Sequence, residues 1–200
     1  MSQTLLHKRE ATYRSLYDHS PVAFFSVSAT DGTILNCNAA ASEQTGYAPD
    51  ELATMTVFQL YADTPDGVDK AKVEFARFKN GEKIAQQQLQ IKRKDGAVTW
   101  ISLSVNPVAD DAGNIIESRS VLTDISALKN AEAEILLSEG RFRVLSEAAP
   151  VGIFQADASG AWTYVNNACC ALMGNPAEDL LGDGWPRHLF PPDHDRVLSE

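Results

Sequence analysis

The chain has 200 residues, of which 44% are hydrophobic and 22% are charged. These are ordinary values for a globular protein of one or two domains, and they exclude a long disordered chain. The formal net charge of −10 comes from 27 acidic and 17 basic residues, and the richest basic run is only Lys92-Arg93-Lys94. Because a negatively charged protein repels phosphate, we expect no direct nucleic-acid partner.

Cysteine usage and the hydrophobicity profile predict where the protein works. Cys37, Cys169 and Cys170 are odd in number and two of them are adjacent, so a reducing compartment is expected rather than a disulfide framework. The first 20 residues lack the apolar core of a signal peptide, and no window approaches 18 uninterrupted apolar residues. The sequence therefore predicts a cytoplasmic location and no membrane contact from this segment.

The first half of the chain predicts short strands and helices. An amphipathic helix is expected within residues 1–18, followed by strands at residues 22–29 and 33–37 that are joined by the Asp31-Gly32 turn. Asn38 can cap the next short helix and Gly46 suits its end. Another helical turn starts at Pro49, and a longer helix is expected over residues 67–80.

Three β runs follow, at residues 84–94, 97–109 and 115–125, with turns at Asp95-Gly96 and within residues 110–114. The element order is two strands, three helical segments and three strands. This order predicts the α+β class, with a five-stranded antiparallel sheet crossed by helices on one face.

The chain contains an internal repeat. Residues 9–25 align with residues 138–154 at an offset of 129, and at an offset of 128 Asn38 aligns with Asn166 and Gly46 with Gly174. Since these are capping positions, the match indicates a repeated fold. We expect a first unit at residues 10–126 and an incomplete second unit at residues 138–200. This predicts a fragment of a longer protein, with an output domain beyond Glu200.

A helix over residues 127–148 is expected to link the two units, and its spacing of residues resembles that of a coiled coil. Leu128, Ile135 and Phe142 are seven residues apart, as are Ala131, Ser138 and Leu145. This a/d pattern fits a marginal parallel dimer, although a monomeric helix could lay the same stripe on its own sheet.

Three motifs are similar to those of the PAS family. They are NAAASEQTGYAPDEL (residues 38–52), RKDGAVTW (93–100) and LTDIS (122–126). The resemblance implies two PAS domains in series that sense a signal and form a homodimer through helices. It implies the input region of a two-component histidine kinase phosphorelay. Alternatives are input to a diguanylate cyclase or phosphodiesterase, or a stand-alone interaction module, including one in transcription regulation.

The resemblance also bears on cofactors. The covalent flavin chemistry of the LOV type needs a cysteine that residues 53–61 lack, and residues 67–81 contain no axial histidine for haem. His194 is expected to be solvated near a helix start. We predict no cofactor, although a noncovalent flavin or a small metabolite stays open. The sequence contains no metal site and no catalytic motif within its 200 residues.

An apolar set with two polar neighbours forms the candidate cavity. It can line a pocket between sheet and helices or simply fill the core, and a filled core is the favoured interpretation. The residues are Phe25, Val27, Leu35, Asn38, Thr45, Met55, Phe58, Phe75, Phe78, Leu89, Ile91, Trp100, Leu103, Val105 and Leu122.

Two further groups of residues have candidate roles. By resemblance, Asp124, Ile125 and Ser126 fix the exit from the sheet into the following helix, and Leu128, Ile135 and Phe142 continue the signal relay. The resemblance also implies an ion pair between Glu51 and Lys94. It either latches the helices to the sheet or, as favoured here, is an exposed pair of little energetic value.

Overall fold

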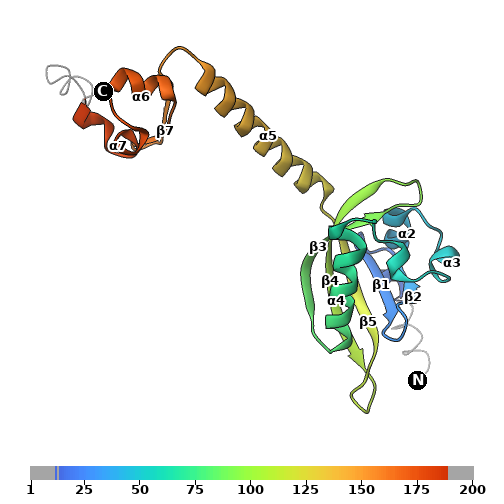
Figure 1. Cartoon of the computed structure of the whole chain (residues 1–200). Helices are drawn as coiled ribbons and strands as arrows, with labels where there is room; N and C mark the ends of the chain where they lie inside the picture. The colour runs from blue at the N-terminus through green and yellow to red at the C-terminus, as the bar shows by residue number, and fades with distance from the viewer. Residues whose placement is uncertain (1–11, 13, 189–200) are drawn as a thin grey trace. The chain divides into compact units, whose positions relative to one another are not determined.

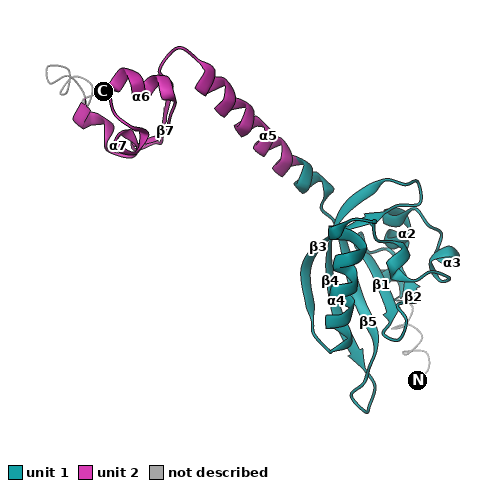
Figure 2. Ribbon diagram, viewed as in Figure 1, with its two compact units in different colours: residues 1–130 teal, residues 131–200 magenta. Residues whose placement is uncertain are grey.

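The computed structural model describes residue 12 and residues 14–188. The chain divides into two compact units, residues 1–130 and 131–200, which have different colours in Figure 2. The boundary falls inside the helix α5 (Ser126–Ala148). Among the described residues, no helix is long and apolar enough to cross a bilayer.

The first unit is built on a five-stranded antiparallel sheet in the order β2-β1-β5-β4-β3 (Figure 1). Its strands are β1 (Ala23–Ser28), β2 (Ile34–Cys37), β3 (Ile84–Lys92), β4 (Val98–Ala109) and β5 (Ile115–Asp124). Ala23, Phe25 and Val27 are buried and alternate with more exposed residues along β1, because successive side chains of a strand point to opposite faces. The predicted α+β fold is confirmed.

Helices pack on one face of this sheet, with α4 running across it (Figure 1). They are α2 (Ala39–Thr45), α3 (Pro49–Leu52) and α4 (Lys70–Lys79), with the short helical turns η1 (Val57–Gln59) and η2 (Pro65–Asp69). Phe78 of α4 and Leu52 of α3 are fully buried, together with Leu89 and Ile101 of the sheet. The core therefore lies between these helices and the inner face of the sheet.

The predicted caps of α2 are present. The Asn38 side chain accepts a hydrogen bond from the Ala41 backbone N–H at 3.1 Å. Gly46 has φ +79°, and its N–H donates to the Ser42 carbonyl at 2.8 Å. A positive φ at a helix end favours glycine because it has no Cβ to clash.

Several predicted boundaries differ from the structure. The long helix α4 begins at Lys70 rather than at residue 67, because Gly67 lies outside helical φ/ψ and interrupts the helix. The strands begin and end at their predicted limits or one to two residues inside them. Of the predicted N-terminal helix, residues 14–18 are helical, whereas residues 1–11 and 13 lie outside the described residues.

The second unit repeats the beginning of the first. After α5 come β6 (Phe154–Ala156), β7 (Trp162–Val165), α6 (Asn167–Met173), α7 (Ala177–Leu180) and η3 (Trp185–His188). This is the order of β1, β2, α2, α3 and η1. Asn166 caps α6 and Gly174 ends it with φ +69°, as Asn38 and Gly46 do in the first unit. The repeat in sequence is therefore also a repeat of structure.

Candidate ligand-binding site

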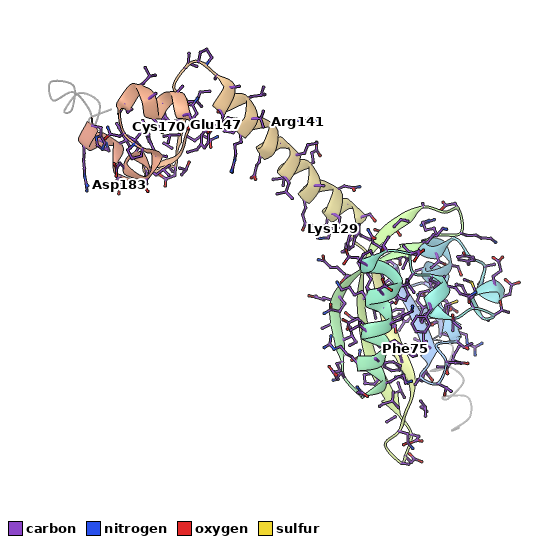
Figure 3. All side chains as sticks on the ribbon, viewed as in Figure 1. Phe75, Lys129, Arg141, Glu147, Cys170 and Asp183 are labelled. Atoms are coloured by element: carbon purple, nitrogen blue, oxygen red, sulfur yellow. The ribbon has the colours of Figure 1, made fainter. Side chains whose placement is uncertain are left out.

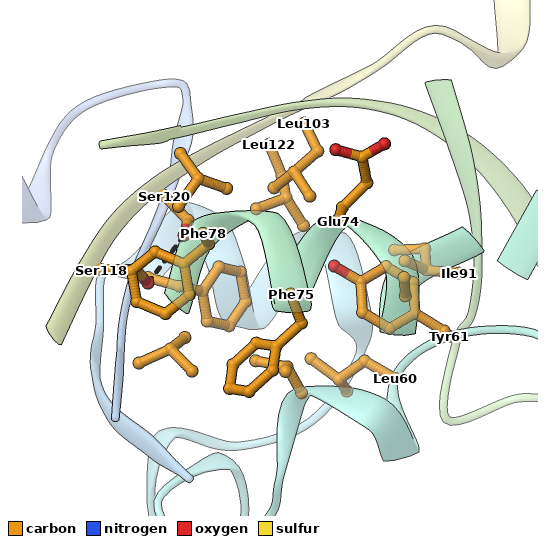
Figure 4. Close-up of a pocket in the computed structure, with 15 residues that line it drawn as sticks. Leu60, Tyr61, Glu74, Phe75, Phe78, Ile91, Leu103, Ser118, Ser120 and Leu122 are labelled. Atoms are coloured by element: carbon orange, nitrogen blue, oxygen red, sulfur yellow. Dashed lines mark hydrogen bonds between the residues drawn. The ribbon is translucent and has the colours of Figure 1, made fainter. Parts of the chain in front are cut away.

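The first unit encloses a cavity of about 50 Å³ between α4, η1 and the inner face of the sheet (Figure 4). It is a mostly apolar space that opens in part to solvent. Its walls are formed by Phe25, Val27, Val57, Leu60, Tyr61, Ala71, Glu74, Phe75, Phe78, Ile91, Leu103, Val105, Ser118, Ser120 and Leu122. A site of this kind has an apolar body and a few polar groups that can orient a ligand.

A pair of serines on β5 supplies polar groups on one side of the cavity. Ser118 and Ser120 are buried on the inner face of the sheet, and their hydroxyl oxygens lie 3.0 Å apart. One hydroxyl donates to the other, so the pair still has one O–H and several lone pairs to offer. Small side chains here, on a strand between β1 and β4, also leave space that larger residues would fill.

Tyr61 and Glu74 lie on the other side of the cavity in Figure 4. Tyr61 reaches the site from the segment after η1, which forms an antiparallel bridge to Ile91 of β3. Burial, reinforced by the negative charge of Glu74, raises the pKa of the Tyr61 phenol well above its usual value. Tyr61 therefore keeps its proton at neutral pH and remains a hydrogen-bond donor.

Glu74 is a carboxylate in a mostly apolar wall. Its side chain is only 8% exposed, and one of its oxygens accepts a hydrogen bond from the Arg77 guanidinium at 2.9 Å. Arg77 is partly exposed and also binds Glu82 at 3.0 Å. Because a buried charge needs a partner, Arg77 explains why a carboxylate is tolerated on the inner side of α4.

Aromatic rings form the wall between the two polar sides. Phe75 packs edge-on against Phe58, with ring centroids 5.1 Å apart, and lies 5.5 Å from Phe78. Phe58 belongs to η1, while the other two rings belong to α4. These contacts connect α4 to the segment that carries Tyr61, so a displacement of one element would also displace the other.

Eight residues of the candidate set line this cavity. They are Phe25, Val27, Phe75, Phe78, Ile91, Leu103, Val105 and Leu122. Leu89 is fully buried in the adjoining core, and Met55 packs against that core. Phe58 lies behind Phe75 and contacts it without lining the space.

Leu35 and Trp100 do not belong to the candidate cavity. Leu35 is 53% exposed, because a bulge in the pairing of β1 with β2 places Ile34, instead of Leu35, opposite Val27. Trp100 precedes the buried Ile101 on β4 and so faces the other side of the sheet.

Asn38 and Thr45 are buried, and their side chains form hydrogen bonds with backbone groups. The Thr45 hydroxyl donates to the Ala41 carbonyl at 2.8 Å, and the Asn38 amide bonds four backbone groups. Neither residue lines the cavity.

Sequence reasoning missed the polar residues of the site. Seven lining residues were absent from the candidate set, namely Val57, Leu60, Tyr61, Ala71, Glu74, Ser118 and Ser120. A signal for the serines was available, since they share the strand parity of Leu122 and must face the same side. The missed residues add a phenol, a carboxylate and two hydroxyls to a set whose only predicted polar members were Asn38 and Thr45.

Side-chain and backbone hydrogen bonds fix the connection between β5 and the start of α5. The Asp124 carboxylate accepts a hydrogen bond from the Ser126 backbone N–H at 2.7 Å. The Ser126 hydroxyl accepts one from the Trp100 backbone N–H at 3.1 Å, and the Ile125 N–H donates to the Trp100 carbonyl at 2.9 Å. One turn later, the Lys129 ammonium lies 5.5 Å from the centre of the Trp100 ring. Trp100 therefore anchors the start of α5 and does not line the pocket.

The a/d stripe of α5 is only partly available to a partner. Residues 131–145 are all exposed, and in Figure 3 their side chains project from the helix on every side. Leu128 and Ile135 have more than half of their surface exposed. Phe142, however, packs edge-on against Tyr164 of β7 at 5.5 Å, so this residue of the stripe contacts its own unit.

Glu51 and Lys94 do form an ion pair. The Lys94 ammonium lies 2.7 Å from both Glu51 carboxylate oxygens, and about half of each side chain is exposed. The hydrogen bond from Lys94, followed by one from the Ala48 N–H, lowers the pKa of Glu51. The pair connects α3 to the turn after β3, at a position where solvent screens it.

Other candidate chemistry is sparse in the part of the chain that the structure describes. Within residue 12 and residues 14–188, no cluster of three or more His, Cys, Asp or Glu side chains is arranged to hold a metal ion. Cys37 is half-buried, and burial raises the pKa of its thiol. His194 lies outside the described residues.

Comparisons with curated proteins find an uncharacterized protein and a sensor histidine kinase among the relatives of this chain. The chain is 26% identical over 156 residues to the uncharacterized protein y4lL of Sinorhizobium fredii, covering 78% of this chain and 18% of that protein. It is 26% identical over 178 residues to the sensor histidine kinase TmoS of Ectopseudomonas mendocina, covering 87% of this chain and 17% of the kinase. The chain thus spans less than a fifth of the length of either relative.

A solved structure and two family models agree with this fold. The PAS domain of an HTR-like protein from Haloarcula marismortui superposes with a TM-score of 0.53 at 16% identity, covering 62% of this chain and 98% of that domain. A model described as "PAS domain" matches residues 21–127, and one described as "PAS fold" matches residues 140–200. Since the first match alone covers more than half of the chain, this protein belongs to the PAS domain family.

Proposed function

We propose that the first PAS unit is a sensory domain that binds a small, mostly apolar molecule in the cavity between α4 and the sheet. The observation that carries this proposal is the cavity itself, in which polar groups face each other across aromatic and aliphatic walls. A ligand with one hydrogen-bonding group could bind either Ser118 and Ser120 or the Tyr61 hydroxyl, while its apolar part contacts Phe75 and Phe78.

The charge and size of the cavity narrow the class of ligand. Glu74 places a negative charge in the wall, which disfavours an anionic ligand group close to it. The volume of about 50 Å³ is far below the roughly 300–1,000 Å³ of sites for drug-sized ligands. This argues for a small neutral or cationic metabolite over a noncovalent flavin.

Matched four-carbon probes test this proposal. We expect 1-butanol and butylamine to shift the backbone amide resonances of Ser118, Ser120 and Glu74 in two-dimensional NMR spectra of the 200-residue chain. Butyrate should leave them in place, because its carboxylate would be repelled by Glu74.

A blocked cavity provides the control. Ser120→Leu should fill the space beside Phe78 and abolish the shifts, while the rest of the spectrum keeps its dispersion. Equal shifts in this variant, a response to butyrate alone, or no response to any probe would contradict the proposed site.

The second part of the proposal is that the signal leaves through β5 and α5. Ser118, Ser120 and Leu122 line the cavity, and Asp124, at the end of the same strand, binds the first turn of α5. A ligand that displaces β5 would therefore also move the start of α5. The output is proposed to be a histidine kinase, as in relatives named sensor histidine kinases. A cyclase or an interaction module remains the alternative.

The proposed relay includes a homodimer formed by the exposed part of the α5 stripe. Leu128 and Ile135 are proposed to form the dimer contact, because Phe142 packs against Tyr164 of its own unit. Ile135→Asp should weaken dimerisation by about tenfold or more, because it places an unpaired carboxylate in an apolar seam. Sedimentation equilibrium of the full chain measures the effect.

Leu137→Asp is the matched control for this experiment. Leu137 is similarly exposed on α5 but lies on a different side of the helix, and its substitution should leave the dimer intact. A monomer at every concentration, or a dimer weakened only by Leu137→Asp, would exclude the Ile135 seam.

A further inference from the structure

The Asn38 side chain is completely used by backbone groups. Its amide nitrogen donates to the carbonyls of Tyr17 and Val22 at 3.0 and 2.9 Å. Its amide oxygen accepts from the N–H groups of Phe24 and Ala41 at 3.0 and 3.1 Å. One buried side chain thus joins the end of the N-terminal helical segment, the start of β1 and the first turn of α2.

Asn166 makes the same set of bonds in the second unit. Its amide nitrogen donates to the carbonyls of Ser146 and Val151 at 2.6 and 3.0 Å. Its oxygen accepts from the N–H groups of Ile153 and Cys169 at 2.9 and 2.8 Å. The residue is fully buried. Each partner lies 128 or 129 positions after its counterpart in the first unit, so the two networks are equivalent.

From these two networks we infer that Asn166 is a positioning residue that fixes the end of α5 to the second PAS unit, as Asn38 does for the helix before the first. The amide nitrogen binds the carbonyl of Ser146, which belongs to the last turn of α5. The amide oxygen binds N–H groups just before β6 and in the first turn of α6. A side chain with two donors on one atom and an acceptor on the other is needed to satisfy both.

Contacts around Asn166 support this role. The Glu147 carboxylate accepts hydrogen bonds from the Tyr164 hydroxyl and the Asn167 N–H, both at 3.0 Å, and Phe142 packs on Tyr164. The last two turns of α5 are therefore attached to the second unit by one amide, one carboxylate and one ring. A shift of α5 along its axis would have to break the bond from Asn166 to Ser146, which is buried and therefore costly to lose.

Asn166→Asp removes the two N–H donors of the side chain while keeping an acceptor oxygen. A carboxylate keeps the acceptor that binds Ile153 and Cys169 and still caps α6, but it cannot donate to Ser146 and Val151. In hydrogen–deuterium exchange of the full chain, peptides covering residues 142–149 should exchange about tenfold faster or more, as expected for the loss of two hydrogen bonds. Peptides from α6 should keep their wild-type exchange rates.

Two further variants make the outcome decisive. Asn166→Ser removes both donor bonds without burying a charge, and it should give the same result if the aspartate variant fails to fold. Asn38→Asp is the matched control, which should accelerate exchange in residues 14–20 and leave residues 142–149 unchanged. Unchanged exchange at the end of α5, or equal acceleration in α5 and α6, would contradict the inference. Neither readout depends on a ligand or a dimer, so this test is independent of the proposed function.

Discussion

Gly67→Ala is expected to destabilise the first PAS unit by about 3 kcal/mol or more, as measured by urea unfolding of the full chain. A Cβ on Gly67 would lie 2.0 Å from the Ala62 carbonyl oxygen and 2.8 Å from its carbon. These are backbone atoms, which cannot rotate away as a flexible side chain can. The segment is also fixed from both sides, because Val68 donates to Ala62 and Ala62 donates to Gln90 of β3.

Gly67→Ala is also expected to change the shape of the cavity. Residues 61–70 carry Tyr61 and lead into α4, so forcing Gly67 away from Ala62 would displace one wall of the site. Gly96→Ala is the control, since Gly96 has φ +89° but a Cβ added there would meet no atom within 4 Å. Gly96→Ala should lower the free energy of unfolding by only about 1–2 kcal/mol, the cost of placing alanine in a left-handed backbone conformation. Equal losses in the two variants would show that the close approach at Gly67 is unimportant.

Phe78→Ala should cost about 3–5 kcal/mol, the range for removing a buried phenylalanine. Phe78 is only 2% exposed and is among the largest fully buried side chains. Its loss removes apolar contacts and enlarges the cavity, since the rigid sheet behind it can collapse only in part. Saturating indole should then raise the melting temperature of the variant, because a ligand bound only by the folded state stabilises it.

The control for this variant lies on the same helix. Val73 is 58% exposed, and Val73→Ala should change the free energy of unfolding by no more than about 0.5 kcal/mol. Indole should have no effect on this variant, because the unenlarged cavity of about 50 Å³ is too small for a bicyclic ring. If Phe78→Ala were equally mild, or if indole stabilised both variants alike, the ring would not define the cavity.

The parts of the fold that depend on local chemistry could be predicted from the sequence. Asn38 and Gly46 mark the ends of α2 because a side-chain cap and a positive φ need those residue types. The inward residues Leu103 and Val105 follow from the period of two along a strand. The same signals recur 128 positions later, at Asn166 and Gly174, and they predict a second unit.

The errors have physical causes that are not local. Leu35 was misplaced because one bulge between β1 and β2 reverses the inside and outside of the shorter strand. Glu74 was absent from the candidate set, and only its contact with Arg77 and the position of α4 on the sheet explain its burial. The contact of Phe142 with Tyr164 joins residues 22 positions apart, and no heptad pattern contains it. Trp100 broke the strand parity of its neighbours, so its outward direction could have been predicted.

The contact between Trp100 and Lys129 gives the first unit a built-in spectroscopic probe. The chain has three tryptophans, and Trp162 and Trp185 both belong to the second unit. The indole of Trp100 lies beside a cation on the first turn of α5, and the emission of an indole responds to nearby charge. Fluorescence of a variant that retains only Trp100 would therefore follow the start of the connecting helix directly, without an attached label.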